Sequence, residues 1–263
     1  MFRIVPPPRP QADAVASSLS RDLVAVRDGR PRRAASLLRK YEAAALLPDL
    51  SVTFRQQMAP AIPLFEQACS ALARGSLLRS PRGPVAIEDL LPGDVIDTSH
   101  GPQPVTWIGA TSYVPGLTDQ TCGLQALLRL TGDALGLGRP AGDLLLGPAA
   151  RMVVTRPYLR RLIGRDRVLV PVADYADGDR IIEVRPGGAV QLYHLMTPRH
   201  GTFSVGGIEL ETYHPGRAVA DLAGHNLRAL FLSLFPQLSA VEEFGALSLT
   251  RSTREVIDGL VAS

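Results

Sequence analysis

Cysteine and long apolar runs are both scarce in this sequence of 263 residues, and their scarcity excludes several classes of protein. The only cysteines, Cys69 and Cys122, do not form the disulfide framework of a small secreted domain, and they lack metal-ligand spacing. No apolar stretch approaches the roughly 20 residues that span a bilayer, and residues 1–8 lack the apolar run of a signal peptide. We therefore expect a cytoplasmic protein without a membrane partner, with leaderless export as the alternative.

Lysine is scarcer still, because it occurs only at Lys40 and arginine supplies the remaining basic charge. The formal net charge is +3. The densest basic cluster combines Gly29–Arg33 with Arg39 and Lys40, and Pro31 interrupts it. Nucleic-acid binding needs basic side chains gathered on one face, so we interpret this cluster as a solvated helix face. We expect no nucleic-acid partner.

The first 70 residues are predicted to form a proline-rich leader followed by a helical region. Pro6–Pro10 cannot enter a helix or a sheet ladder. Two sets of apolar residues then repeat with helical spacing: Val15, Leu19, Leu23 and Val26, and then Ala34, Leu37, Leu38, Tyr41 and Ala45. Phe54–Met58 and Leu64–Ala73 are predicted as further short helical turns, so this region either docks on the next domain or forms a semi-detached arm.

Residues 71–216 are predicted to form a domain of short β-strands, because β-forming runs alternate there with turn signals at close spacing. The expected strands include Asp143–Leu146, Met152–Thr155, Arg167–Pro171, Arg180–Val184 and Val190–Met196. The clearest element is a hairpin in which Thr202–Val205 and Ile208–Leu210 flank Gly206-Gly207. Two consecutive glycines supply the positive φ angles that a tight hairpin turn requires.

The last part of the chain, residues 217–263, is predicted to be a helical extension. Leu227–Phe235 has the apolar spacing of a helix that Pro236 ends, and Arg254–Val261 is predicted as a short closing helix. The predicted fold class is therefore mainly β, with helical N- and C-terminal flanks.

Four sequence blocks occur in an order that resembles the Hint domain, the self-processing β-fold of inteins and Hedgehog C-terminal regions. The blocks are Ala71–Val95, Trp107–Gly109, Leu144–Val153 and Val190–Pro215. The Trp-Ile-Gly block is similar to one in the bacterial branch of the family. The resemblance implies a Hint-like horseshoe of short strands from about Ala71 to Gly216.

The same resemblance places alanine where the reaction needs functional groups. Self-processing in this family begins when a Cys, Ser or Thr side chain attacks the peptide bond before it. Ala71 takes the position of that nucleophile, and Ala150 takes the position of the His that polarises the scissile carbonyl. Splicing members also end their last block in His-Asn, where this sequence has His214-Pro215. The resemblance therefore implies the fold without ordinary splicing.

Although these two positions are alanines, four other residues are candidate catalytic residues. His200 matches the family's late His, which assists the second acyl transfer, and His194 stands where many inteins have Asp. Ser70 and Cys69 lie one and two residues before Ala71, and each needs an altered local geometry to act as a nucleophile. The alternative interpretation of both histidines is a hydrogen-bonded structural role.

The leading hypothesis is a Hint domain with a degenerate self-processing site that serves as a binding or scaffold module for an unknown protein partner. We expect no cofactor and no metal, since the acidic residues lack the spacing of a metal-binding loop. One alternative is residual autoproteolysis near residues 69–71, with Ser70 or Cys69 as nucleophile and His200 as acid–base. Another is a small hydrolase built around His194 and His200, although no Gly-x-Ser-x-Gly motif marks a nucleophile.

Overall fold

The computed structural model describes residues 37–117, 122–219 and 225–260 of the chain. Within these residues the fold is mainly β, as predicted, and its strands form two antiparallel sheets. The proline-rich leader and the helix predicted around Val15–Val26 lie outside the described residues. Among the helices that the structure describes, none is long and apolar enough to cross a membrane.

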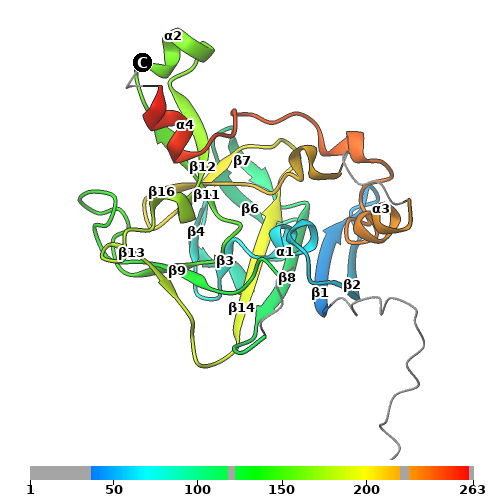
Figure 1. The fold of residues 1–263 in the computed structure, drawn as a ribbon. Helices are drawn as coiled ribbons and strands as arrows, with labels where there is room; N and C mark the ends of the chain where they lie inside the picture. The colour runs from blue at the N-terminus through cyan, green and yellow to red at the C-terminus, as the bar shows by residue number, and fades with distance from the viewer. Residues whose placement is uncertain (1–36, 118–121, 220–224, 261–263) are drawn as a thin grey trace, which may run out of the picture. The chain divides into compact units, whose positions relative to one another are not determined.

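The first sheet has eight strands and carries β3 in its interior (Figure 1). Its strands, in order across the sheet, are β13 (Ile181–Val184), β9 (Leu127–Leu130), β10 (Leu144–Leu146), β3 (Leu72–Ala73), β14 (Val190–Met196), β8 (Trp107–Tyr113), β1 (Leu38–Leu46) and β2 (Val52–Pro60). The residues that directly follow Ala71 therefore lie between β10 and β14, so the chain around Ala71 is held on both sides.

The second sheet contains the predicted hairpin. Its strands are β12 (Arg167–Pro171), β11 (Arg151–Thr155), β16 (Ile208–Glu211), β15 (Thr202–Val205), β4 (Leu77–Ser80) and β5 (Gly83–Ala86), and β6 (Val95–Thr98) pairs with β15 and with β7 (Gly101–Pro104). Val205 pairs with Ile208 across the turn, and Gly206 and Gly207 have φ angles of 55° and 80°. The Gly-Gly hairpin is therefore confirmed.

The helical segments that the structure describes are short. They are α1 (Pro63–Cys69), α2 (Leu159–Ile163), α3 (His225–Leu232) and α4 (Arg254–Gly259), with 3₁₀ turns η2 (Ile87–Asp89), η3 (Val172–Tyr175), η4 (Gly216–Val219) and η5 (Val241–Phe244). α1 begins at Pro63, whose fixed φ suits the first helical turn, and it packs against β8 and β14. The predicted helices after residue 217 are confirmed in α3 and α4, and α1 confirms the first part of Leu64–Ala73.

The helices predicted for Ala34–Ala45 and Phe54–Met58 are wrong, because the described parts of both segments lie in β1 and β2. Tyr41, Ala43 and Ala45 are buried in β1, whereas the residues between them are partly exposed. An apolar pair four residues apart fits one face of a strand as well as one face of a helix. β1 pairs with β2 along its whole length and with β8 on its other side, and these long-range pairs override the local pattern.

An aromatic cluster joins the two flanks of the chain to the first sheet. Its aromatic members are Tyr41, Phe65, Trp107, Tyr213, Phe231, Phe235 and Phe244. The Trp107 indole N–H donates to the Leu234 carbonyl over 2.6 Å. Residues before Ala71 and residues of the C-terminal extension therefore share one core with β8.

Candidate functional site

The chain leaves α1 at Cys69 and enters the first sheet through Ser70 and Ala71. The Ala71 N–H donates to the Tyr193 carbonyl over 2.9 Å, and the Ala71 carbonyl accepts from the Gly147 N–H over 2.9 Å. The Ala71 side chain is buried in the main core. The peptide on either side of Ala71 is thus fixed by β14 and by the turn after β10.

The Ser70 carbonyl, which precedes Ala71, is held by the same turn. The Ala149 N–H donates to it over 3.1 Å. A Cβ atom on Gly147 would lie 2.1 Å from the Ser70 oxygen, so only glycine leaves room for this carbonyl. A backbone donor therefore polarises the bond that a nucleophile at position 71 would attack. We call Ser70, Ala71 and Gly147–Ala150 the processing region.

The two candidate nucleophiles, Cys69 and Ser70, have different surroundings. Cys69 is fully buried in the aromatic cluster, and burial raises the pKa of its thiol far above the ordinary range. A thiol is a nucleophile only as its thiolate, so burial suppresses this reactivity. The Ser70 hydroxyl is buried without a hydrogen-bond partner among the described residues, so no base contacts it there.

His194 lies between two backbone carbonyls. Its Nδ1 is 3.1 Å from the Gln67 oxygen and its Nε2 is 3.3 Å from the Glu211 oxygen. Burial lowers the pKa of His194 to about 4, even though both carbonyls favour the charged form. The neutral imidazole carries a single N–H, so it donates to only one of these two carbonyls at a time.

His200 is held by Glu211 on one side and by the C-terminal extension on the other. The Ser248 N–H donates to Nδ1 over 2.9 Å, so the ring proton resides on Nε2, which donates to Glu211 Oε1 over 3.0 Å. The Ser248 hydroxyl also lies 3.1 Å from Nδ1. Because the single lone pair of Nδ1 already accepts the Ser248 N–H, it is not free to deprotonate that hydroxyl.

Glu211 is the centre of this network. Its side chain is 2% exposed and accepts Arg251 Nε at 2.9 Å, while Arg151 lies 3.8 Å away. Burial alone raises the pKa of Glu211, but the His200 hydrogen bond and the Arg251 charge outweigh it and lower the pKa. His214 closes the network, since its backbone carbonyl accepts Arg251 Nη2 over 2.6 Å.

Residues 70–217, more than half of the chain, match the family model described as the Hint domain. This chain belongs to the Hint domain family. No curated protein matches it. The matched segment begins at Ser70, directly before Ala71, and ends at Arg217, before α3. Membership establishes the fold, whereas the chemistry depends on the residues of the site.

The sequence alone did not reveal the polar network that this Hint domain builds around Glu211. Glu211 and His200 belong to the last block of the resemblance, but Arg251, which donates to Glu211, and Ser248, which donates to His200, come from the extension outside the matched segment. Arg251 is 40 residues from Glu211 in the chain. No spacing rule connects residues so far apart, so only the fold could identify this network.

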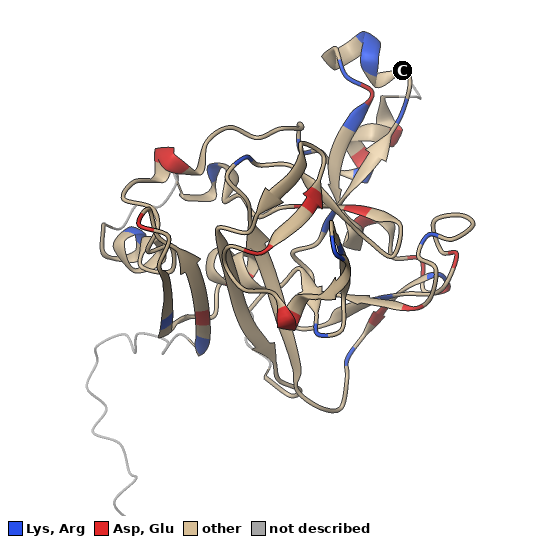
Figure 2. Cartoon of the chain, turned by 180° about the vertical axis from the view of Figure 1, so that it is seen from behind, with Lys and Arg blue, Asp and Glu red and all other residues tan. Residues whose placement is uncertain are grey.

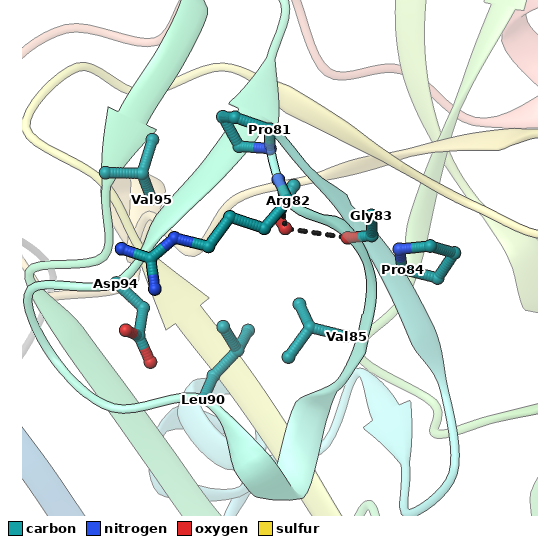
Figure 3. Close-up of a pocket in the computed structure, with 9 residues that line it drawn as sticks. Pro81, Arg82, Gly83, Pro84, Val85, Leu90, Asp94 and Val95 are labelled. Carbon is teal, nitrogen blue, oxygen red and sulfur yellow. Dashed lines mark hydrogen bonds between the residues drawn. The ribbon is translucent and has the colours of Figure 1, made fainter.

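A separate cavity of about 470 Å³ lies beside the turn between β4 and β5 of the Hint domain (Figure 3). The Arg82 side chain extends over it towards Asp94, and Ser80 Oγ donates to the Gly83 carbonyl over 2.6 Å. None of the four candidate catalytic residues lines this cavity. In the part of the chain that the structure describes, no three His, Cys, Asp or Glu residues are grouped to hold a metal ion.

Proposed function

We propose that this protein is a Hint domain that no longer processes itself and that serves as a binding or scaffold module. The observation that carries the proposal is the processing region, where a backbone donor holds the Ser70 carbonyl while Ala71 and Ala150 offer only methyl groups. The first step of self-processing transfers the acyl group to a side-chain oxygen or sulfur. Alanine at position 71 has no atom that accepts it.

The donor at Ala149 does not replace the missing groups. An oxyanion donor lowers the barrier by about 3 kcal/mol, but it stabilises charge only after a nucleophile has attacked. His194 and His200 are both engaged in hydrogen bonds that connect structural elements. These bonds support the structural interpretation of the two histidines.

The segment before the processing region also supports a stable module. β1 and β2 extend the first sheet beyond β8, and Phe65 of α1 is fully buried in the aromatic cluster. A segment that is released after cleavage would not need to share a sheet and a core with the rest of the domain. We infer that residues 37–70 act with the matched segment as one structural body, on which a protein partner binds.

Residual autoproteolysis is the second candidate, and one observation favours it. The Ser70 Oγ has no hydrogen-bond partner among the described residues, although buried hydroxyls are normally satisfied. An attack by this hydroxyl on the Cys69 carbonyl would break the Cys69–Ser70 peptide bond, transfer the acyl group to Ser70 Oγ and leave the Ser70 nitrogen as a free amine. Water or a thiol would then open the ester and separate residues 1–69 from residues 70–263. The small-hydrolase alternative rests on His194 and His200, and the Ser248 N–H that occupies His200 Nδ1 argues against it.

Mass spectrometry under denaturing conditions separates these functions. The purified full chain is incubated with and without dithiothreitol, and we expect one species of 28.2 kDa in both samples. Fragments that end near residue 70 and disappear in the Ser70→Ala or Cys69→Ala variant would instead establish autoproteolysis. Ser204→Ala is the matched control, because Ser204 lies in β15, away from the processing region.

A further inference from the structure

A second cavity lies where the C-terminal extension crosses the end of the Hint domain. Its volume is about 620 Å³. Three arginines, four other side chains and one glycine line it, with no carboxylate among them: Ile163, Arg165, Gly216, Arg217, Leu247, Leu249, Thr250 and Arg251. α2, the helix that supplies Ile163, also carries Arg160 and Arg161, and Arg160 pairs with Asp166 (Figure 2). The lining therefore combines positive charge with an aliphatic wall.

One guanidinium of the cavity is held rigidly. Arg251 donates from Nε to Glu211 Oε1 over 2.9 Å and from Nη2 to the His214 carbonyl over 2.6 Å. Gly216 has a φ angle of 62°, and a Cβ atom there would lie 2.6 Å from Arg251 Nη1. A glycine at this position thus leaves space for the guanidinium, which is already oriented before any ligand arrives.

The surroundings of this guanidinium carry more positive than negative charge. Arg151 and Arg251, each with a side chain 20% exposed, share the single carboxylate of Glu211. The pKa of Arg151 is lowered first by burial and then by the charge of Arg251, which indicates that the two cations repel each other. Arg165 is tied to the Ser248 carbonyl, and Arg217 is exposed at the cavity. An anion would relieve this repulsion.

We propose that this cavity binds an oxyanion, a carboxylate or phosphate group carried by the partner of the module. Arg251 already donates from Nε and Nη2 within the protein, so the two-oxygen contact is made by the exposed Arg217, whose planar guanidinium fork matches the two oxygens of such a group. Ile163 and Leu247 contribute an apolar wall against which an aliphatic part of the ligand packs. The inference rests on the proposed binding function and names the chemistry that the partner presents.

The test is an amide NMR titration of the full chain at constant ionic strength, with inorganic phosphate and isovalerate as separate probes. We expect saturable shifts of the Gly216 and Arg217 amides with at least one probe. The double variant Arg165→Gln, Arg217→Gln should bind that probe about tenfold more weakly or worse. Saturation by phosphate alone would identify a phosphate-bearing partner, and saturation by isovalerate alone would identify a carboxylate.

The matched control is the double variant Arg55→Gln, Arg82→Gln, which removes two exposed charges away from this cavity. Its affinity should equal that of the unchanged protein. Failure of both probes to saturate, or equal weakening in both double variants, would overturn the oxyanion site. The NMR titration and the mass spectrometry are independent measurements. Failure of the oxyanion site can therefore be distinguished from failure of the proposed function.

Discussion

At the scale of single residues, Ala71 and Ala150 contribute only methyl groups to the processing region, in which the backbone holds the Ser70 carbonyl. Ala149 holds the Ser70 carbonyl, and Gly147 leaves space for it. The glycine matters because any side chain at position 147 would displace this oxygen. Ala71 and Ala150 therefore lack reactive groups at positions where the main chain is already arranged.

On the proposed function, reactive groups introduced at positions 71 and 150 should produce cleavage. In the Ala71→Cys variant, we expect the new thiol to attack the Ser70 carbonyl and dithiothreitol to open the thioester, which yields fragments 1–70 and 71–263. Adding Ala150→His should accelerate the step by about a hundredfold, as expected for one donor to a developing oxyanion. Denaturing mass spectrometry follows both variants over time.

The control for this experiment is Ala73→Cys with Ala150→His, because Ala73 is also buried but follows a different peptide bond. It should remain intact. If Ala71→Cys folds, as judged by its circular dichroism, and is never cleaved with or without the histidine, the backbone of the processing region is not competent. Ala71→Cys alone keeps the test valid even when the additional Ala150→His substitution prevents folding.

His194 should make stability fall as the solution becomes acidic. Its folded pKa is about 4 and its ordinary value is 6.5, so below about pH 6.5 the unfolded chain takes up a proton that the folded chain does not. The free energy of unfolding should therefore decrease between about pH 6.5 and pH 4, by about 3 kcal/mol at most. Above about pH 6.5 this residue contributes no pH dependence.

Urea unfolding at about pH 7 and about pH 4 measures this effect. The His194→Asn variant carries an amide near the place of Nδ1 but does not titrate, so its stability should change less with pH than that of the unchanged protein. An equal change in both proteins would show that other groups cause the acid sensitivity.

At the scale of secondary structure elements, a buried ion pair connects β1, α1 and the residues before β9. Arg39 Nε donates to Glu66 Oε1 over 3.1 Å, and Glu66 Oε2 accepts the Gly123 N–H over 2.6 Å. The Cys122 thiol also donates to Glu66 Oε1 over 3.0 Å. The pair positions α1, and hence the entry of the chain into the processing region.

Glu66→Gln should destabilise the protein by about 3 kcal/mol, because it leaves the buried Arg39 charge without its negatively charged partner. The comparison variant is Glu42→Gln, which removes an exposed partner of Lys40 and should cost less than about 0.5 kcal/mol. Chemical unfolding of both variants at neutral pH measures the difference. Similar losses would contradict the role assigned to the buried pair.

The elements that the sequence predicted are those with local signals. Gly206-Gly207 predicts its hairpin because a tight turn needs positive φ angles, and Val190–Met196 predicts β14 from a run of β-forming residues. β1 was missed because Tyr41 and Ala45 satisfy helix and strand spacing alike. Only pairing with β2 and β8 decides between them.

At the scale of the whole molecule, the order of the four sequence blocks predicted the Hint domain family. The fold then revealed contacts between the C-terminal extension and the Hint domain that the blocks could not predict. Position-by-position matching assigned Ala71 to the nucleophile position, which stays a prediction, and the structure shows that the carbonyl before it accepts the Ala149 N–H. The matching could not locate Arg251 or Ser248, since their contacts with Glu211 and His200 depend on how the C-terminal extension crosses the domain.

The pairing of β1 with β8 has a consequence for any event that breaks the chain before Ala71. Residues 37–70 supply two strands of the first sheet and part of the aromatic cluster. Cleavage there would therefore leave two polypeptides in a tight noncovalent complex of equal stoichiometry. Nothing would diffuse away, and the nicked protein would keep its native hydrodynamic size until a denaturant separated the pieces.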